Sequence, residues 1–167
     1  AKVAENKNYF TKSDFTNLNI TDKILFFIQN KYKVSYIFNA TSLQQGFIYH
    51  YLTNPTDDSY YLQTVYEYLG NLDIHKYKEA WEMAIKRFPA LRLCFNWDET
   101  PIQIISQQGD LKFLEHDIES TDKQLVDIIN EDRLQRFDFT KPTLFRLNLV
   151  KHANSRYTLI KTSHHII

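Results

Sequence analysis

The sequence has few of the residues that break or cross-link small proteins. Its 167 residues include one cysteine, three glycines and four prolines. The single thiol, Cys94, cannot form an intramolecular disulfide, and its apolar setting, Leu-Arg-Leu-Cys-Phe, predicts a buried and unreactive side chain. The shortage of glycine and proline excludes a low-complexity linker. No Gly-rich phosphate loop and no Gly-x-Ser-x-Gly nucleophile motif is present.

An excess of one charge and a long apolar run are also missing. Twenty basic residues balance 20 acidic residues without forming a basic block. This balance argues against nucleic acid or an anionic membrane as the main partner. The apolar stretches are too short to cross a bilayer, and the first residues, AKVAENKNYF, lack the apolar core of a signal peptide. The sequence therefore predicts a soluble, cytoplasmic protein.

Aromatic residues are plentiful, with 11 tyrosines and 12 phenylalanines, and their spacing helps to predict the elements. Helical periodicity predicts helices over residues 22–31, 43–52, 74–88 and 123–136. Alternation predicts strands over residues 60–69, 91–97, 101–106, 111–116, 144–150 and 157–167. This order predicts a mixed α/β fold of the α+β type, with a largely antiparallel sheet and helices packed on one face.

The predicted elements also indicate the environment of two groups of side chains. The aromatic stripe around Trp81 is expected to pack in the core. The acidic residues that could suggest paired catalytic carboxylates are instead expected to be solvated or capping groups; they are Glu82, Glu131, Asp132 and Asp138.

Two adjacent histidines, His164 and His165, lie in the final run TSHHII. Neighbours on a strand point to opposite faces, so only one of the two imidazoles can enter a given cleft. Such a pair chelates poorly, and neither a Cys-x-x-Cys nor a helical His-x-x-x-His accompanies it, so no metal site is expected. The dipeptide leaves two roles open: a core histidine beside an exposed one, or an acid/base imidazole at the mouth of a cleft. Ile166 and Ile167 would fray as a natural end, so we expect a fragment cut just after a central strand.

Several segments resemble the condensation domains of nonribosomal peptide synthetases, which belong to the chloramphenicol-acetyltransferase-like acyltransferases. The run TSHHII resembles the start of the motif His-His-x-x-x-Asp-Gly. Residues 41–50 resemble Ser-Pro-Met-Gln-x-Gly-Met-Leu-Phe-His, with identities at Gln44, Gly46 and His50. Residues 87–95 resemble Arg-His-x-x-Leu-Arg-x-x-Phe, with identities at Arg87, Leu91, Arg92 and Phe95. Residues 137–146 resemble Phe-Asp-Leu-x-x-x-Pro-Leu-x-Arg, and residues 10–15 resemble the Thr-Pro-Ser-Asp-Phe segment that precedes such domains.

The resemblance implies a chloramphenicol-acetyltransferase-like N-terminal lobe over residues 34–167, truncated within the His-His-x-x-x-Asp motif, with residues 1–33 as a linker or docking segment. It implies that His165 is the catalytic imidazole, as a general base toward the amine or as a group that stabilises the tetrahedral intermediate. His164, Arg92, Gln44 and Gly46 are then structural residues at the site. Gly46 stands where some members have Arg, so it is a candidate mark of a subtype that accepts a D-configured donor.

The implied reaction is peptide-bond formation between thioesters held on the 4'-phosphopantetheine arms of donor and acceptor peptidyl carrier proteins. No directly bound cofactor is implied. The other implied partners are a missing C-terminal lobe and neighbouring synthetase modules, and the isolated lobe is expected to be inactive. Three alternatives stay open. They are a docking module for an upstream synthetase or carrier protein, a fragment of an epimerization domain, and an unrelated acyltransferase with a small-molecule acceptor.

Overall fold

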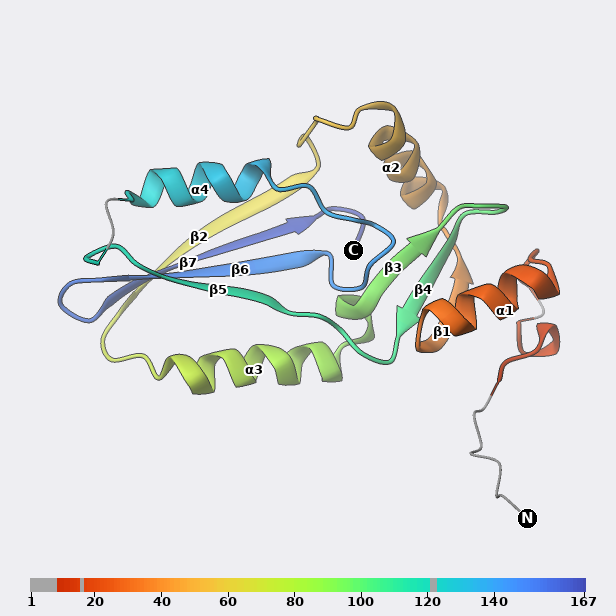
Figure 1. The fold of residues 1–167 in the computed structure, drawn as a ribbon, viewed down its shortest axis with the longest axis horizontal. Coiled ribbons are helices and arrows are strands. Elements are labelled where there is room, and N and C mark those ends of the chain that lie inside the picture. Colours follow the sequence, from red (N-terminus) through yellow and green to blue (C-terminus); the bar gives the residue numbers. More distant parts are fainter. Residues whose placement is uncertain (1–8, 16, 121–122) are drawn as a thin grey trace, which may run out of the picture.

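Two β-sheets of unequal size, with helices packed on them, make up the computed structural model, which describes residues 9–15, 17–120 and 123–167 (Figure 1). The larger sheet has the strand order β2-β7-β6-β5, and the smaller has the order β1-β4-β3. Strands β5 and β6 are parallel and are joined through helix α4, whereas the other pairs are antiparallel. The mixed, largely antiparallel α/β architecture that the sequence predicts is confirmed.

The helices and strands lie close to the predicted ranges. The α-helices are α1 (Asp22–Lys31), α2 (Ser42–Thr53), α3 (Ile74–Arg87) and α4 (Leu125–Leu134), and the 3-10 helices are η1 (Lys12–Asp14) and η2 (Pro89–Arg92). The strands are β1 (Val34–Asn39), β2 (Tyr61–Leu69), β3 (Leu93–Asn96), β4 (Ile102–Ser106), β5 (Lys112–Asp117), β6 (Phe145–His152) and β7 (Arg156–His164). Among the described residues, no helix is long and apolar enough to cross a membrane.

Strand β1 is the one β-strand of the described residues that the sequence does not predict, and the short 3-10 helices η1 and η2 are not predicted either. Strand β1 pairs antiparallel with β4, and Ile37 lies opposite Ile104 in that register. Its outer side chains, Tyr36 and Phe38, are exposed aromatic residues stacked on each other, with ring centroids 6.2 Å apart. The aromatic and β-branched run Val-Ser-Tyr-Ile-Phe favours a strand, but it is short and lies directly between two helices.

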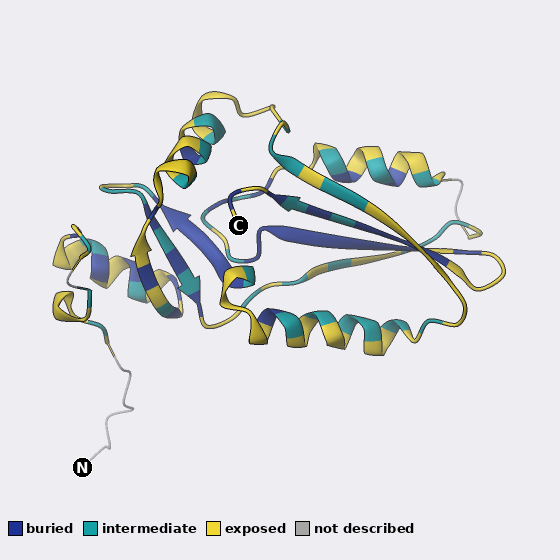
Figure 2. Cartoon of the chain, turned by 180° about the vertical axis from the view of Figure 1, so that it is seen from behind, coloured by how far each residue is buried: buried dark blue, intermediate teal, exposed yellow. Residues whose placement is uncertain are grey.

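Both faces of the larger sheet are covered, which corrects the prediction of helices on one face. On one face, Phe145, Leu147 and Leu149 of β6 pack against α3, with Trp81 beside them as predicted. On the other face, Val150 and Ile160 pack against Ile128 of α4. Figure 1 shows the two helices on opposite sides of the sheet, and Figure 2 shows that β6 and β7 are its most buried strands. Central strands with apolar residues on both alternations need such double cover.

Helix α1 packs against the smaller sheet. Its Leu25 and Ile28 pack with Ile37, Cys94 and Ile104 in one buried cluster. Cys94 is fully buried, and burial raises the pKa of its thiol to about 12. A thiol that stays protonated at neutral pH is a poor nucleophile, so the predicted inert, buried cysteine is confirmed.

A buried carboxylate, Asp132, joins α4 to the larger sheet. The Asp132 side chain is 2% exposed. Its Oδ1 accepts hydrogen bonds from Arg146 Nε at 2.6 Å and from Asn148 Nδ2 at 2.8 Å. Its Oδ2 accepts from Gln63 Nε2 at 2.8 Å and from the Thr162 hydroxyl. The prediction that Asp132 is a solvated or capping residue is therefore wrong.

The position of Asp132 on its helix explains this burial. It lies four residues after Ile128, so both side chains point from the same face of α4 toward the sheet. The charged partner, Arg146, alternates with the apolar residues of β6 and is 3% exposed in its side chain. Its guanidinium also stacks over the Phe137 ring at 4.4 Å. Charges this deeply buried persist because each is paired and hydrogen-bonded.

Replacing Asp132 with asparagine is expected to destabilise the fold strongly. The Asp132→Asn variant keeps the side-chain shape but leaves the buried Arg146 charge without a counter-charge, which costs about 3–5 kcal/mol. The neighbouring Glu131→Gln is the matched control, because Glu131 is exposed and pairs with Lys123 at the surface. That control should cost less than about 1 kcal/mol. Denaturant unfolding measures both changes, and equal losses in the two variants would contradict the account.

Candidate active site

The two histidines lie where strand β7 leaves the sheet. The predicted strand over 157–167 is too long at its end, because β7 stops at His164 and a turn contains His165 and Ile166. The ladder ends there because both neighbouring strands begin there. The last pairs are Tyr61 with His164 and Phe145 with Ser163.

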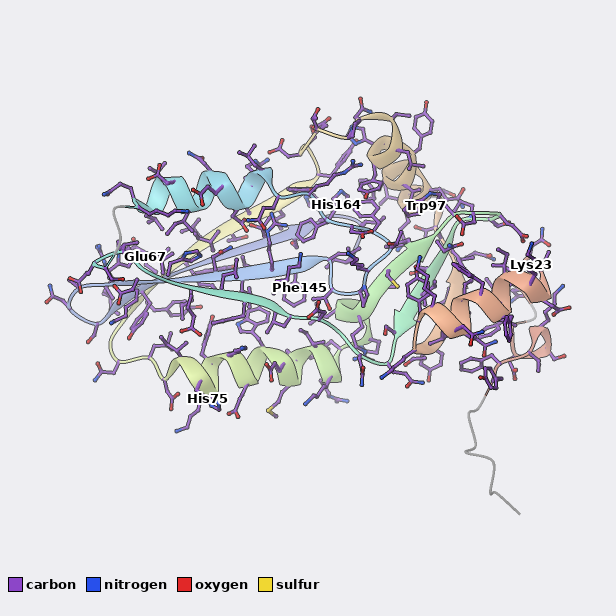
Figure 3. The ribbon with its side chains drawn as sticks, viewed as in Figure 1. Lys23, Glu67, His75, Trp97, Phe145 and His164 are labelled. Atoms are coloured by element: carbon purple, nitrogen blue, oxygen red, sulfur yellow. The ribbon has the colours of Figure 1, made fainter. Side chains whose placement is uncertain are left out.

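His164 is enclosed by aromatic rings. It is 6% exposed, and its ring lies 4.6 Å from the Phe139 ring and 5.6 Å from the rings of Phe47 and Tyr61, each centroid to centroid and nearly perpendicular. Tyr60 adds a more distant, tilted contact at 6.2 Å. Figure 3 shows His164 at the end of β7, beside α2. Edge-to-face packing of this kind is favourable and fixes the ring plane.

The His164 ring is held in its neutral form. Burial, followed by the neighbouring His165 and His50, lowers its pKa to about 4. Its Nδ1 accepts a hydrogen bond from the backbone N–H of Ile166 at 3.0 Å. An imidazole nitrogen that accepts carries no proton, so the proton of neutral His164 lies on Nε2. At neutral pH the uncharged ring therefore serves as a hydrogen-bond acceptor for the backbone.

His165, in contrast, is exposed, and its backbone is bound on both sides. Its N–H donates to the Tyr60 carbonyl at 3.0 Å. The next residue, Ile166, donates to His164 Nδ1, and its carbonyl accepts from Gln44 Nε2 at 3.4 Å. The Ile166 side chain is buried against Phe95 and Phe139. The imidazole of His165 thus projects from a turn whose backbone is hydrogen-bonded to Tyr60, just before β2, to Gln44 of α2 and to His164 at the end of β7.

Helix α2 presents two further residues of the predicted site, Gln44 and Gly46. Thr41 caps the helix: its Oγ1 accepts from Gln44 N–H at 3.2 Å, and Gln44 Oε1 accepts from the Thr41 N–H at 2.9 Å. This capping box orients the Gln44 amide so that Nε2 also reaches Gln103 Oε1 at 3.3 Å. Gly46 is exposed on the same helix, and a Cβ added to it meets no described atom within 4 Å. The structure therefore leaves open space where a side chain at position 46 would extend.

The hydrogen bonds of Arg92 are to segments other than the histidine turn. Arg92 is 8% exposed, and it donates through Nε to the Ser106 carbonyl at 2.8 Å and through Nη1 to the carbonyls of Ile85 and Lys86. These partners are the end of α3 and the end of β4. A guanidinium at the carboxyl end of a helix satisfies carbonyls that have no partner within the helix. The arrangement makes Arg92 a structural link between α3 and the smaller sheet.

A pocket of about 240 Å³ lies beside the turn, on the α3 face of the larger sheet. Its lining consists of Trp81, Ala90, Leu91, Phe145, Lys161, Ser163 and Ile167. Phe145, which forms part of its floor, is labelled in Figure 3 between β6 and α3. The alternation of β7 places Lys161 and Ser163 on this face, while Thr162 and His164 face α4.

The sequence indicates no functional role for residues 50 to 60 beyond the motif match at His50. In the structure, His50 Nε2 lies 3.0 Å from Asp57 Oδ2, and its ring packs perpendicular to the Tyr60 ring at 4.8 Å. No sequence spacing pairs a helix-end histidine with a loop carboxylate, so these contacts come from the fold. Within the described ranges, no group of three or more His, Cys, Asp or Glu side chains is placed to hold a metal ion.

The comparison with protein families assigns the chain. The family model described as the condensation domain matches residues 34–167, which is most of the sequence. The chain therefore belongs to the condensation-domain family, as the motifs predict.

Relatives of known name agree with this assignment. The chain is 38% identical, over 138 residues, to N-(5-amino-5-carboxypentanoyl)-L-cysteinyl-D-valine synthase of Penicillium rubens, a match that covers 78% of the chain and 4% of that protein. It is 30% identical to bacitracin synthase 3 of Bacillus licheniformis, over 94% of the chain and 3% of the relative. The chain thus spans only a small part of the length of these relatives.

Solved structures share the fold. A four-domain nonribosomal peptide synthetase bound to AMP and glycine superposes with a TM-score of 0.72 at 21% identity, covering 92% of this chain and 11% of that one. The first condensation domain of the CDA synthetase superposes with a TM-score of 0.70 at 17% identity, covering 80% of this chain and 36% of that one. The chain has the fold of part of a condensation domain.

Acid is expected to destabilise the chain through His164. Below about pH 6.5 the unfolded chain binds a proton on this imidazole, whereas the folded chain does so only near its lowered pKa of about 4. The stabilisation is therefore complete above about pH 6.5 and is lost as the pH falls. Between about pH 7.5 and about pH 5, His164 should account for about 2 kcal/mol of lost unfolding free energy.

The test compares the wild type with His164→Asn, which has an acceptor oxygen near the place of Nδ1. Denaturant unfolding at the two pH values should show a loss smaller by about 2 kcal/mol in the variant. The difference between pH values, rather than the absolute stability, carries the result. An identical pH dependence in the two proteins would show that His164 binds protons equally well in the folded and unfolded chains.

Proposed function

We propose that residues 34–167 are the N-terminal lobe of a condensation domain that forms peptide bonds between carrier-bound thioesters. The observation that carries the proposal is an exposed imidazole, His165, on a turn that is hydrogen-bonded to Tyr60, just before β2, and to Gln44 of α2, and that follows a buried, neutral His164. A reaction between two tethered substrates needs positioning and one proton transfer, and a fixed imidazole suits both needs.

In the proposed reaction, the amine of the acceptor attacks the thioester carbonyl carbon of the donor. A C–N bond forms, the C–S bond breaks, and the donor phosphopantetheine leaves as a thiol. His165 accepts the proton that the attacking nitrogen loses, or it stabilises the tetrahedral intermediate by a hydrogen bond. In the first case the proton finally passes to the leaving thiolate, which keeps the reaction balanced without another reactant.

The substrates of this reaction are aminoacyl or peptidyl groups on the 4'-phosphopantetheine arms of donor and acceptor carrier proteins. The proposed partners are therefore those two carrier proteins, a C-terminal lobe that completes the tunnel, and neighbouring synthetase modules. The whole assembly is expected in the cytoplasm. The pocket of about 240 Å³ supports the proposal, since Ser163 and Ile167, which lie two residues before and after His165, are part of its lining.

Residues 1–33 precede the part that matches the family model, and we propose that they form a linker or docking segment. Residues 1–8 and 16 lie outside the described residues. Helix α1 packs Leu25 and Ile28 on the smaller sheet, but its outer side has an exposed Phe26, 65% accessible, and an exposed Phe27. Exposed aromatic residues on one helix face favour a protein contact there.

Removing the imidazole of His165 in the full parent domain is expected to abolish most of the condensation rate. With both carrier proteins loaded, the His165→Ala variant should form the peptide product about 10²–10⁴-fold more slowly, the range that general acid–base groups contribute. Single-turnover product formation, followed by mass spectrometry, measures the loss.

Two controls accompany this experiment. The isolated 167-residue chain should give no product, because half of the proposed tunnel is absent. His75→Ala removes an exposed imidazole on α3, whose ion pair is with Glu79, and should leave the rate unchanged. A His165→Ala rate within about twofold of the wild-type rate would refute the catalytic role, because a loss this small is far below the contribution of an acid–base group. Turnover by the isolated chain would refute the need for a second lobe.

A further inference from the structure

We propose that His50 and Asp57 are positioning residues for His165, acting through the loop that leads from α2 into β2. The inference rests on the proposed function, in which His165 is the reacting group. The N–H of His165 donates to the carbonyl of Tyr60, the residue just before β2. Whatever fixes the Tyr60 peptide therefore fixes the point from which the His165 imidazole extends.

The loop from 54 to 60 is folded around the Asp57 carboxylate. Its Oδ1 accepts from the N–H of Ser59 at 2.8 Å and from the Ser59 hydroxyl at 2.5 Å. Its Oδ2 faces His50 Nε2 at 3.0 Å. The hydrogen bonds from Ser59 hold the pKa of Asp57 below its ordinary value, so the carboxylate is charged at neutral pH. Asp57 thus joins the last turn of α2 to Ser59, the residue next to Tyr60.

A second contact runs through the rings. The His50 ring packs perpendicular to the Tyr60 ring at 4.8 Å, and Tyr60 packs in the same way on Phe47 at 4.8 Å. Phe47 and His50 lie one turn apart on α2, so the helix holds Tyr60 from two of its side chains. The backbone of Tyr60 and its ring are therefore both fixed relative to α2.

The other side of the loop is fixed by α4. Arg133 forms an ion pair with Asp58 and donates to the Asp58 carbonyl at 3.4 Å. The neighbouring Asp132 is the buried carboxylate that holds α4 on the sheet. The loop is thus bound at Asp57 by α2 and at Asp58 by α4, and Tyr60 follows both contacts.

This geometry predicts that His50 and Asp57 affect the position of the His165 imidazole and not the binding of substrate. The hydrogen bond and ring contacts described for His50 and Asp57 are with loop residues, and neither residue lines the pocket, so their loss should shift the imidazole without changing the pocket walls. A misplacement of about 1 Å can cost up to about 10²-fold in rate. We expect a smaller loss here, about tenfold, because the Gln44 and His164 hydrogen bonds still hold the turn.

The experiment uses the full parent domain with loaded carrier proteins and compares His50→Ala, His50→Gln and Asp57→Asn. His50→Ala should lower kcat about tenfold with KM for the loaded acceptor carrier protein within about twofold. His50→Gln keeps a side-chain N–H donor toward Asp57 and should recover most of kcat. The matched control is His75→Ala, which breaks an exposed histidine–carboxylate pair far along the chain on α3 and should change neither constant.

A second readout does not depend on turnover. Amide hydrogen exchange of His165 reports its bond to Tyr60 directly, and it should become about tenfold faster in His50→Ala and in Asp57→Asn. Unchanged exchange, or a loss of activity that lies wholly in KM, overturns the positioning role. If the wild-type parent domain forms no peptide bond, the proposed function fails, while the exchange result still decides whether this loop holds His165.

Discussion

Burial of the His164 imidazole is the interaction on which the rest of the candidate site depends. The ring is inserted among Phe47, Tyr61 and Phe139, and it accepts the N–H of the residue two positions later. That bond bends the chain out of the strand just where the ladder ends. The intervening residue, His165, is consequently carried on the outside of a tight turn. The burial of His164 therefore contributes to the exposure of His165.

The larger sheet supports this turn with different chemistry on its two faces. The face toward α4 is polar at its centre, where Asp132 collects hydrogen bonds from β2, β6 and β7. Thr162 donates to Asp132, and His164 follows two residues later on the same face of β7. The hydrogen bonds of Asp132 and the aromatic rings around His164 therefore lie next to each other along this strand. The face toward α3 is apolar and ends in the pocket beside Ser163. A hydrogen-bonded polar interior on one side of the sheet thus lies behind an apolar face with a pocket on the other.

Periodicity and motifs predicted much of this arrangement, for identifiable reasons. The helices and most strands have strong local patterns, and the family motifs carried the assignment of the chain. What was missed depends on contacts between distant segments. Asp132 belongs to a polar pair of helix residues in the sequence, Glu131 and Asp132, and only the phase of Ile128 distinguishes the buried one. The contact of His50 with Asp57 needs the loop conformation, which no local pattern encodes.

Strand β1 and the end of β7 show the same limit. Composition favours a strand at β1 without establishing it, and the length of β7 is determined by its partner strands. His165 and Ile166 alternate correctly for a strand, and they leave the sheet because β2 and β6 supply no further partner residues. The exposure of His165 thus arises from sheet topology as well as from the burial of its neighbour. The roles of His164 and His165 in the reaction remain predictions.

The most direct test of the central claim is a long-range ¹⁵N–¹H correlation spectrum of the imidazole rings at about pH 6. The account predicts that His164 is neutral, with its proton on Nε2 and an unprotonated, hydrogen-bonded Nδ1. A spectrum in which His164 is charged, or carries its proton on Nδ1, would contradict it, because that ring could not accept the Ile166 N–H that forms the turn.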